Sequence, residues 1–161
     1  GDSTGRFMER SLFFSYYDWN VIAEFSTYEE YQSNLELFDA RWNTSKSIEV
    51  VTAYESFYED TKAGIYFVDI RSEEKVLVSH IANAVWIPFT GDDSYDLEQV
   101  QELFPDREKC RFVIYGKNGE GFTENNKLNS WGYKSVVMYE GICEWADKGY
   151  PIKYGVTIHN K

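Results

Sequence analysis

The sequence predicts an α/β fold with a mainly parallel five-stranded sheet and helices on both faces. Strand-like and helix-like segments alternate along most of the chain, which implies right-handed crossovers between parallel strands. Four of the strand-like segments are nearly continuous apolar runs, as expected for strands buried on both faces. The length of 161 residues fits one domain with an extension.

The first part of the chain, residues 1–46, reads as an aromatic-rich extension that is helical and packs on the domain. Residues 11–25 are dense in aromatic side chains, and residues 26–42 have helical periodicity with Ser26 or Thr27 as the expected cap. The apolar face expected for this helix consists of Tyr28, Tyr31, Leu35, Phe38 and Trp42. This extension is the candidate surface for a protein partner.

The predicted domain covers residues 47–152, and residues 153–161 are expected to form a tail. Its expected strands are 47–51, 65–70, 83–89, 111–116 and 135–140. Its expected helices are 52–64, 97–104, 123–132 and 142–150, with a short helix or turn at 71–80 and a polar loop at 90–96. A Thr52–Glu55 capping box is expected to start the first of these helices, and Gly64 to end it.

In such sheets, functional sites form at the carboxyl ends of the strands. The loops at that edge are 71–75, 116–122 and 140–142. The predicted ligand-binding loop is the second of them, Gly116, Lys117, Asn118, Gly119, Glu120, Gly121 and Phe122.

Composition excludes several classes of protein. With 27 acidic and 16 basic residues the net charge is −11, which disfavours binding to nucleic acid and to anionic membranes. No apolar run is long enough to span a membrane, so an acidic, soluble protein is expected. The two cysteines, Cys110 and Cys143, form neither a disulfide framework nor a zinc motif, and we expect no metal and no cofactor. The first residue is not Met, and the compartment stays open: cytoplasmic, or periplasmic or secreted after removal of a signal peptide.

Three known kinds of turn can follow a strand and precede a helix in this way, and the loop after the fourth predicted strand can be compared with each of them. "GKNGEGFT" has the glycine spacing of a P-loop, but Phe122 stands where that motif needs a lysine. The glycine spacing does not fit a dinucleotide-binding turn. The third kind is a cradle in which backbone N–H groups and a helix N-terminus activate a cysteine thiolate. The frame of that cradle is present, but residues 116–122 contain no cysteine.

Three segments in order resemble the rhodanese-like family. "IYFVDIRS" and "SHIANAVWIPF" are similar to its Asp-x-Arg strand and its His-Ile-Pro-Gly-Ala segment, and "WGYKSVVMYEGICEWADKGYPI" is similar to its closing segment. The matching residues are Asp69, Arg71, His80, Ile81, Ala84, Ile87, Pro88, Gly132, Tyr133, Val137, Gly141, Trp145, Gly149, Tyr150 and Pro151. The resemblance covers residues 47–152 and implies the fold of a sulfurtransferase.

The resemblance also locates a departure. Active members carry a cysteine as the first loop residue, and here that position falls on Gly116, or on Tyr115 or Lys117 if the register slips by one. Gly121 stands where the family has a second arginine that would hold an anionic donor. Transfer of sulfur through the protein needs a side chain that can carry it. The expectation is therefore an inactive enzyme homologue that serves as a binding or regulatory module.

The alternative is a thiosulfate or persulfide sulfurtransferase that uses a displaced cysteine. Cys110 precedes the fourth strand, about 20 Å from the loop. Cys143 lies on the correct edge, at the start of the last predicted helix, and is the candidate substitute. For Asp69, Arg71 and His80 the sequence favours structural roles, an ion pair for the first two and a backbone hydrogen bond for the third.

Overall fold

The computed structural model describes residues 21–59 and 62–155, with side chains from Tyr28 onward. The chain divides into two compact units, residues 1–33 with Lys161, and residues 34–160. Most of the aromatic segment 11–25 lies outside the described residues. The described part of the first unit is the beginning of α1 (Val21–Thr44), in which the Tyr28 and Tyr31 rings are 6.2 Å apart. Because α1 starts before Ser26 and Thr27, the predicted cap at those residues is wrong.

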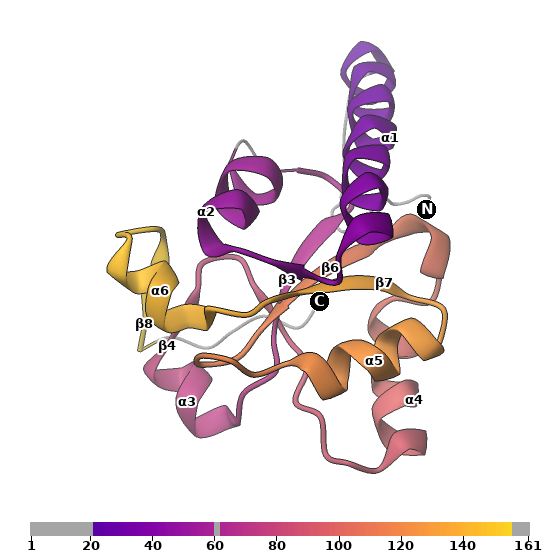
Figure 1. Ribbon diagram of the computed structural model, residues 1–161. Helices are drawn as coiled ribbons and strands as arrows, with labels where there is room; N and C mark the ends of the chain where they lie inside the picture. Colours follow the sequence, from indigo (N-terminus) through magenta and orange to yellow (C-terminus); the bar gives the residue numbers. More distant parts are fainter. Residues whose placement is uncertain (1–20, 60–61, 156–161) are drawn as a thin grey trace. The chain divides into compact units, whose positions relative to one another are not determined.

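The second unit contains the predicted five-stranded sheet, and all its pairings are parallel (Figure 1). Its strands are β2 (Ser47–Ile48), β3 (Ile65–Asp69), β5 (Val85–Trp86), β6 (Arg111–Tyr115) and β7 (Lys134–Met138). The order across the sheet is β2-β7-β6-β3-β5, with the best-buried strand, β6, at the centre. The α/β fold class is confirmed. Over the described residues, no helix combines the length and the apolar character needed to cross a membrane.

One face of the sheet is covered by α4 (Asp93–Leu103) and α5 (Phe122–Ser130). Alternate residues of the central strands, among them Phe112 and Ile114, form a buried cluster there with Val100 of α4 and Leu128 of α5. This packing positions the beginning of α5, and therefore the end of the 116–122 loop, beside β6.

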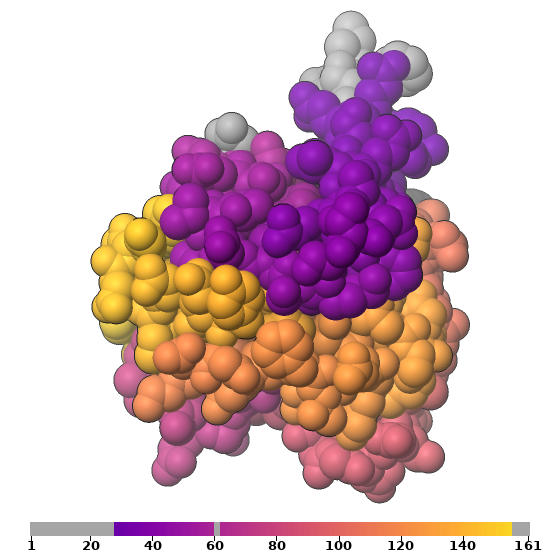
Figure 2. All heavy atoms as spheres, viewed as in Figure 1, coloured from indigo at the N-terminus to yellow at the C-terminus, as the bar shows by residue number. Residues whose placement is uncertain are grey.

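The opposite face is aromatic. Phe67 of β3 contacts Trp145 of α6 (Gly141–Asp147) at 5.5 Å between ring centroids, and Phe38 of α1 contacts Phe57 at 5.3 Å. Figure 2 shows α6 and the segment around Tyr54 side by side at the surface, where the Tyr54 ring stacks at 3.9 Å on that of Tyr150. The aromatic residues of this unit therefore serve mainly in packing.

Two helices begin earlier than the sequence predicts. The helix expected at 52–64 begins as α2 (Val50–Ala53) and continues as a π-helical turn, Tyr54–Tyr58. The Thr52–Glu55 capping box is wrong, since the N–H of Val50 is held by the carboxylate of Glu140, 90 residues away, at 2.8 Å. Likewise α4 begins at Asp93, inside the predicted 90–96 loop, because Asp92 caps it by accepting the Tyr95 N–H.

A second, two-stranded sheet has no counterpart in the prediction. After α3 (Glu73–Val78), β4 (Ser79–Ile81) pairs antiparallel with β8 (Ile152–Tyr154). The predicted short helix or turn at 71–80 therefore resolves into a helix followed by a strand. Both strands have three residues, which is too short for a reliable alternation pattern.

Candidate functional site

At the carboxyl edge, the 116–122 loop and the segment around 140–142 are joined by backbone hydrogen bonds. The carbonyl of Gly116 accepts the Ile142 N–H at 3.0 Å, and the carbonyl of Lys117 accepts the Cys143 N–H at 3.2 Å. The N–H of Gly119 donates to Tyr139 O at 2.6 Å. The first N–H groups of α6 are thus occupied by loop carbonyls, so this helix end does not offer them to an external anion.

Gly141 permits this close contact between the loop and α6. Its φ is +72°, and a Cβ placed there would overlap the Lys117 carbonyl and stand 2.8 Å from Gly116 O. Only glycine combines this backbone conformation with the absence of a side chain. Gly141 matches the family pattern in the sequence, but the close contact with the Lys117 and Gly116 carbonyls that requires glycine is seen only in the structure.

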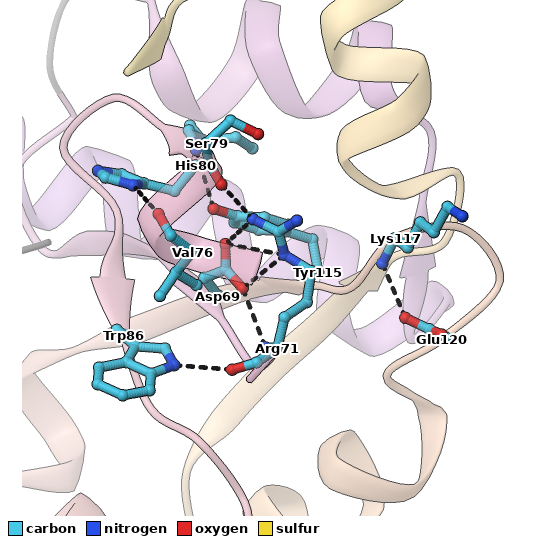
Figure 3. Close-up of polar contacts among 10 residues, drawn as sticks. Asp69, Arg71, Val76, Ser79, His80, Trp86, Tyr115, Lys117 and Glu120 are labelled. Atoms are coloured by element: carbon cyan, nitrogen blue, oxygen red, sulfur yellow. Dashed lines mark hydrogen bonds and ion pairs between the residues drawn. The ribbon is translucent and has the colours of Figure 1, made fainter. Parts of the chain in front are cut away.

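Glu120 folds back across the beginning of the loop (Figure 3). Its Oε1 accepts the Lys117 N–H at 2.8 Å. A Cβ built on Gly116 would overlap that oxygen and lie 2.8 Å from Glu120 Cβ. The space that a side chain at residue 116 would use is therefore occupied by a neighbouring carboxylate.

Beside the loop lies a buried ion pair between Asp69, the last residue of β3, and Arg71 (Figure 3). Asp69 is fully buried and accepts three hydrogen bonds from the Arg71 guanidinium, Nη2–Oδ2 at 2.8 Å, Nε–Oδ1 at 3.0 Å and Nε–Oδ2 at 3.3 Å. The hydroxyl of Tyr115, the last residue of β6, accepts the Ile81 N–H at 3.0 Å. Burial and then the Asp69 charge raise the pKa of Tyr115 well above its usual value, so this phenol stays protonated.

Arg71 is held rigidly by further contacts. Its Nη2 donates to Ser79 O at 2.6 Å, and its carbonyl accepts the Trp86 Nε1–H at 2.7 Å. Burial by itself would lower the pKa of Arg71, but the hydrogen-bonded Asp69 carboxylate outweighs burial and raises it. Nη1 makes no hydrogen bond to any residue that the structure describes, so it remains available to a ligand. His80, from the same region of the sequence, is buried with Nδ1 at 2.8 Å from Val76 O.

The two cysteines occupy different environments. Cys110 is buried before the first residue of β6, donates to Asp106 O at 3.6 Å, and has its pKa raised by burial. A thiol that stays protonated is a poor nucleophile. Cys143 is half-buried in the first turn of α6, and its backbone contacts the loop.

A small cavity opens at the mouth of the loop. It measures about 180 Å³ and is lined by Arg71, Ser72, Lys75, Lys117 and Glu120. A second cavity of about 310 Å³ shares Arg71 and Lys75 with it and extends along α3 to Val78. Three basic side chains thus border the loop mouth of a chain whose net charge is −11.

The roles of several residues of this site cannot be predicted from the sequence. Lys75, Tyr115 and Glu140 each take their role from a partner far away in the chain. The sequence places Glu120 and its negative charge within the loop. Its position just after Gly119, which has φ +77°, indicates a turn, but the direction of its side chain is not readable from the letters.

Comparison with known proteins gives the family. A family model described as the rhodanese-like domain matches residues 51–148. Because that match covers more than half of the chain, the protein belongs to the rhodanese-like family. Comparison with curated proteins gives no significant match.

Solved structures show the same fold at low sequence identity. A Bacillus halodurans protein is 17% identical with a TM-score of 0.54, over 76% of this chain and 87% of its own. A rhodanese-related protein from Thermoplasma volcanium is 22% identical with a TM-score of 0.51, over 67% of this chain and 97% of its own. Thiosulfate sulfurtransferase from Pseudomonas aeruginosa is 19% identical with a TM-score of 0.51, over 76% of this chain and 22% of its own.

Proposed function

We propose that this rhodanese-like domain is a non-catalytic binding or regulatory module whose ligand site is the loop Gly116–Phe122 at the carboxyl edge. The observation that carries the proposal is the space beside Gly116. No side chain is present there to accept a sulfur atom, and the carboxylate of Glu120 occupies the volume that such a side chain would need.

The chemistry of sulfur transfer explains why this matters. A thiolate attacks the outer sulfur of thiosulfate, the S–S bond breaks, sulfite leaves, and the protein holds a persulfide until an acceptor such as cyanide removes the sulfur. Gly116 has no atom that can form that bond. A carboxylate next to the reacting position would also repel an anionic donor.

What remains at this edge is suited to binding. The Arg71 guanidinium is held in place by Asp69 and Ser79 with Nη1 open, and Lys75 and Lys117 line the same cavity. A volume of about 180 Å³ accommodates an acidic group.

The test is an assay of thiocyanate formation from thiosulfate and cyanide. The wild-type protein and Cys143→Ser are both expected to be inactive. Gly116→Cys alone should gain little, because Glu120 obstructs the new side chain, whereas Gly116→Cys combined with Glu120→Gly should form a persulfide. A matched control places the thiol elsewhere in the loop, as Asn118→Cys with Glu120→Gly, and should stay inactive.

The alternative function, sulfur transfer by a displaced cysteine, is favoured by one observation. The backbone N of Cys143 lies 3.2 Å from Lys117 O, and the residue is only half-buried. Thiocyanate formation by the wild-type protein that disappears in Cys143→Ser would establish this alternative and refute the binding proposal.

A protein partner recruited through residues 1–46 is part of the same proposal. The support is compositional, since residues 11–25 are rich in Phe, Tyr and Trp. A direct test compares the full chain with one that begins at Val21 in chemical cross-linking to proteins of the host cell. Loss of a specific cross-linked species in the shorter chain would support recruitment, and identical patterns would count against it.

A further inference from the structure

We propose that Glu120 is an internal ligand of the loop-mouth cavity, and that the external ligand of this cavity is a carboxylate-bearing molecule that displaces it. The inference rests on the proposed binding function and specifies the ligand's chemistry and its competitor. Two observations support it: the hydrogen bond that Glu120 accepts from the Lys117 N–H, and the three basic side chains that line the same cavity.

The first observation is the contact that Glu120 makes. Its Oε1 accepts the Lys117 N–H at 2.8 Å, and its side chain lies over Gly116, which is buried, while Glu120 itself is exposed (Figure 3). A carboxylate is thus already accommodated at the start of the loop by a backbone donor. Because solvent reaches that carboxylate, its hydrogen bond with the Lys117 N–H contributes little free energy, and an external carboxylate can replace it.

The second observation is electrostatic. The cavity is lined by Arg71, Lys75 and Lys117, and Glu120 is its only acidic lining residue in the part of the chain that the structure describes. Burial lowers the pKa of Arg71 and Asp69 raises it, and the charge of Glu120 adds to the increase. Glu120 therefore acts on the same guanidinium that an external anion would approach.

These two observations define the ligand. Arg71 is already paired with Asp69 at 2.8 Å, so displacement of Glu120 leaves a cavity that Lys75 and Lys117 also line with no acidic residue among its described lining. An incoming carboxylate restores a negative charge there and takes over the Lys117 N–H. The loop is already shaped around a planar carboxylate, which makes that group, carried by a metabolite or by an acidic peptide, the matching chemistry.

Two variants separate the effect of charge from the effect of occupancy. Glu120→Gln keeps an oxygen that can accept the Lys117 N–H but removes the negative charge, and Glu120→Ala removes both. Glu102→Gln is the matched control, because Glu102 is exposed near the end of α4. That end of α4 packs at the amino ends of the strands, where Phe104 contacts Phe112 at 4.8 Å.

The experiment is a titration with acetate at constant ionic strength, in which the NMR signal of the Lys117 backbone amide is followed. Half-saturation is expected at an acetate concentration about tenfold lower in Glu120→Gln than in the wild-type protein, equivalent to about 1.4 kcal/mol. In Glu120→Ala the midpoint is expected to be equal to or lower than that of Glu120→Gln. Glu102→Gln should titrate like the wild type. Equal midpoints for Glu120→Gln and Glu102→Gln, or no response of Lys117 in any variant, would overturn the inference.

Inorganic sulfate distinguishes the shape of the ligand. We expect Glu120→Ala to increase the affinity for sulfate, relative to the wild-type protein, by a smaller factor than the affinity for acetate. An equal or larger factor for sulfate would assign the cavity to tetrahedral anions instead. The outcome is separable from the proposed function: thiocyanate formation by the wild-type protein would refute the non-catalytic proposal without changing the acetate result, and the reverse also holds.

Discussion

At the scale of single residues, the geometry of the loop depends on Gly141. We expect Gly141→Ala to lower the free energy of unfolding by about 2 kcal/mol more than Gly149→Ala, because overlap with packed backbone adds to the conformational cost. Gly149 is the matched control: its φ is +79°, and no heavy atom lies within 4 Å of a Cβ placed there. Gly149→Ala should therefore lower the free energy of unfolding by only about 1–2 kcal/mol, the cost of placing a residue with a Cβ in a left-handed backbone conformation.

Urea denaturation of the two variants measures this difference. Hydrogen exchange at the Ile142 and Cys143 amides supplies a local readout, since both donate to the loop and should lose protection in Gly141→Ala. Equal destabilisation by the two alanines would mean that the loop moves aside without cost.

The candidate site could be predicted from the sequence only in part at this scale. The order of the strands and the positions of the glycines predict the edge of the sheet and the loop, and the sequence shows directly that this loop contains no cysteine. The side chain that covers Gly116 cannot be predicted in this way, because a carboxylate on a turn can point outward or back, and the choice depends on the Lys117 N–H and the nearby cations.

At the scale of elements, the second half of α1 is part of the core of the 34–160 unit. Phe38 is fully buried there, whereas its neighbour Leu37 is 51% exposed. Phe38→Ala should lower the free energy of unfolding by about 3–5 kcal/mol, and Leu37→Ala by less than about 1 kcal/mol. Chemical denaturation of the pair measures this, and similar small losses for both would show that this half of α1 does not pack as described.

An ion cluster fixes the same helix to the sheet and makes a pH prediction. Asp39 binds Arg111 of β6 at 2.7 Å and Lys134 of β7 at 3.2 Å. Burial would raise the pKa of Asp39, but these two cations outweigh burial and lower it from 3.8. Because the folded-state pKa is depressed, the stabilisation is complete above the unfolded value and is lost as pH falls through the folded value.

Asp39→Asn should therefore be less stable than the wild type at pH 7, by about 1 kcal/mol after solvent screening of this partly exposed group. The difference should shrink as the pH is lowered below 3.8. Thermal unfolding across this range, with buffers of equal ionic strength, measures it. A gap that stays constant with pH would show that the carboxylate charge is not what stabilises the contact.

The elements differed in how well the sequence predicted them, for physical reasons. The central strands β3, β6 and β7 were placed within two residues at each end, since burial on both faces requires continuous apolar runs. The starts of α2 and α4 were missed because they depend on particular carboxylates, Glu140 and Asp92. The β4–β8 pair was missed because a three-residue strand carries little pattern.

At the scale of the whole molecule, the net charge of −11 and the cationic cavity act in opposite directions. The net negative charge predicts repulsion of polyanions such as nucleic acid. A small carboxylate can approach closely enough for Lys75, Lys117 and Arg71 to outweigh that repulsion, because salt screens distant charges more than near ones.

The proposed non-catalytic function implies that this rhodanese-like protein forms no persulfide. Its most direct test is the intact mass of the purified wild-type protein after incubation with thiosulfate, with and without a reducing agent. The account predicts an unchanged mass in both conditions. A mass increased by one sulfur atom that reverts on reduction, and that is mapped by peptide analysis to Cys143, would contradict it.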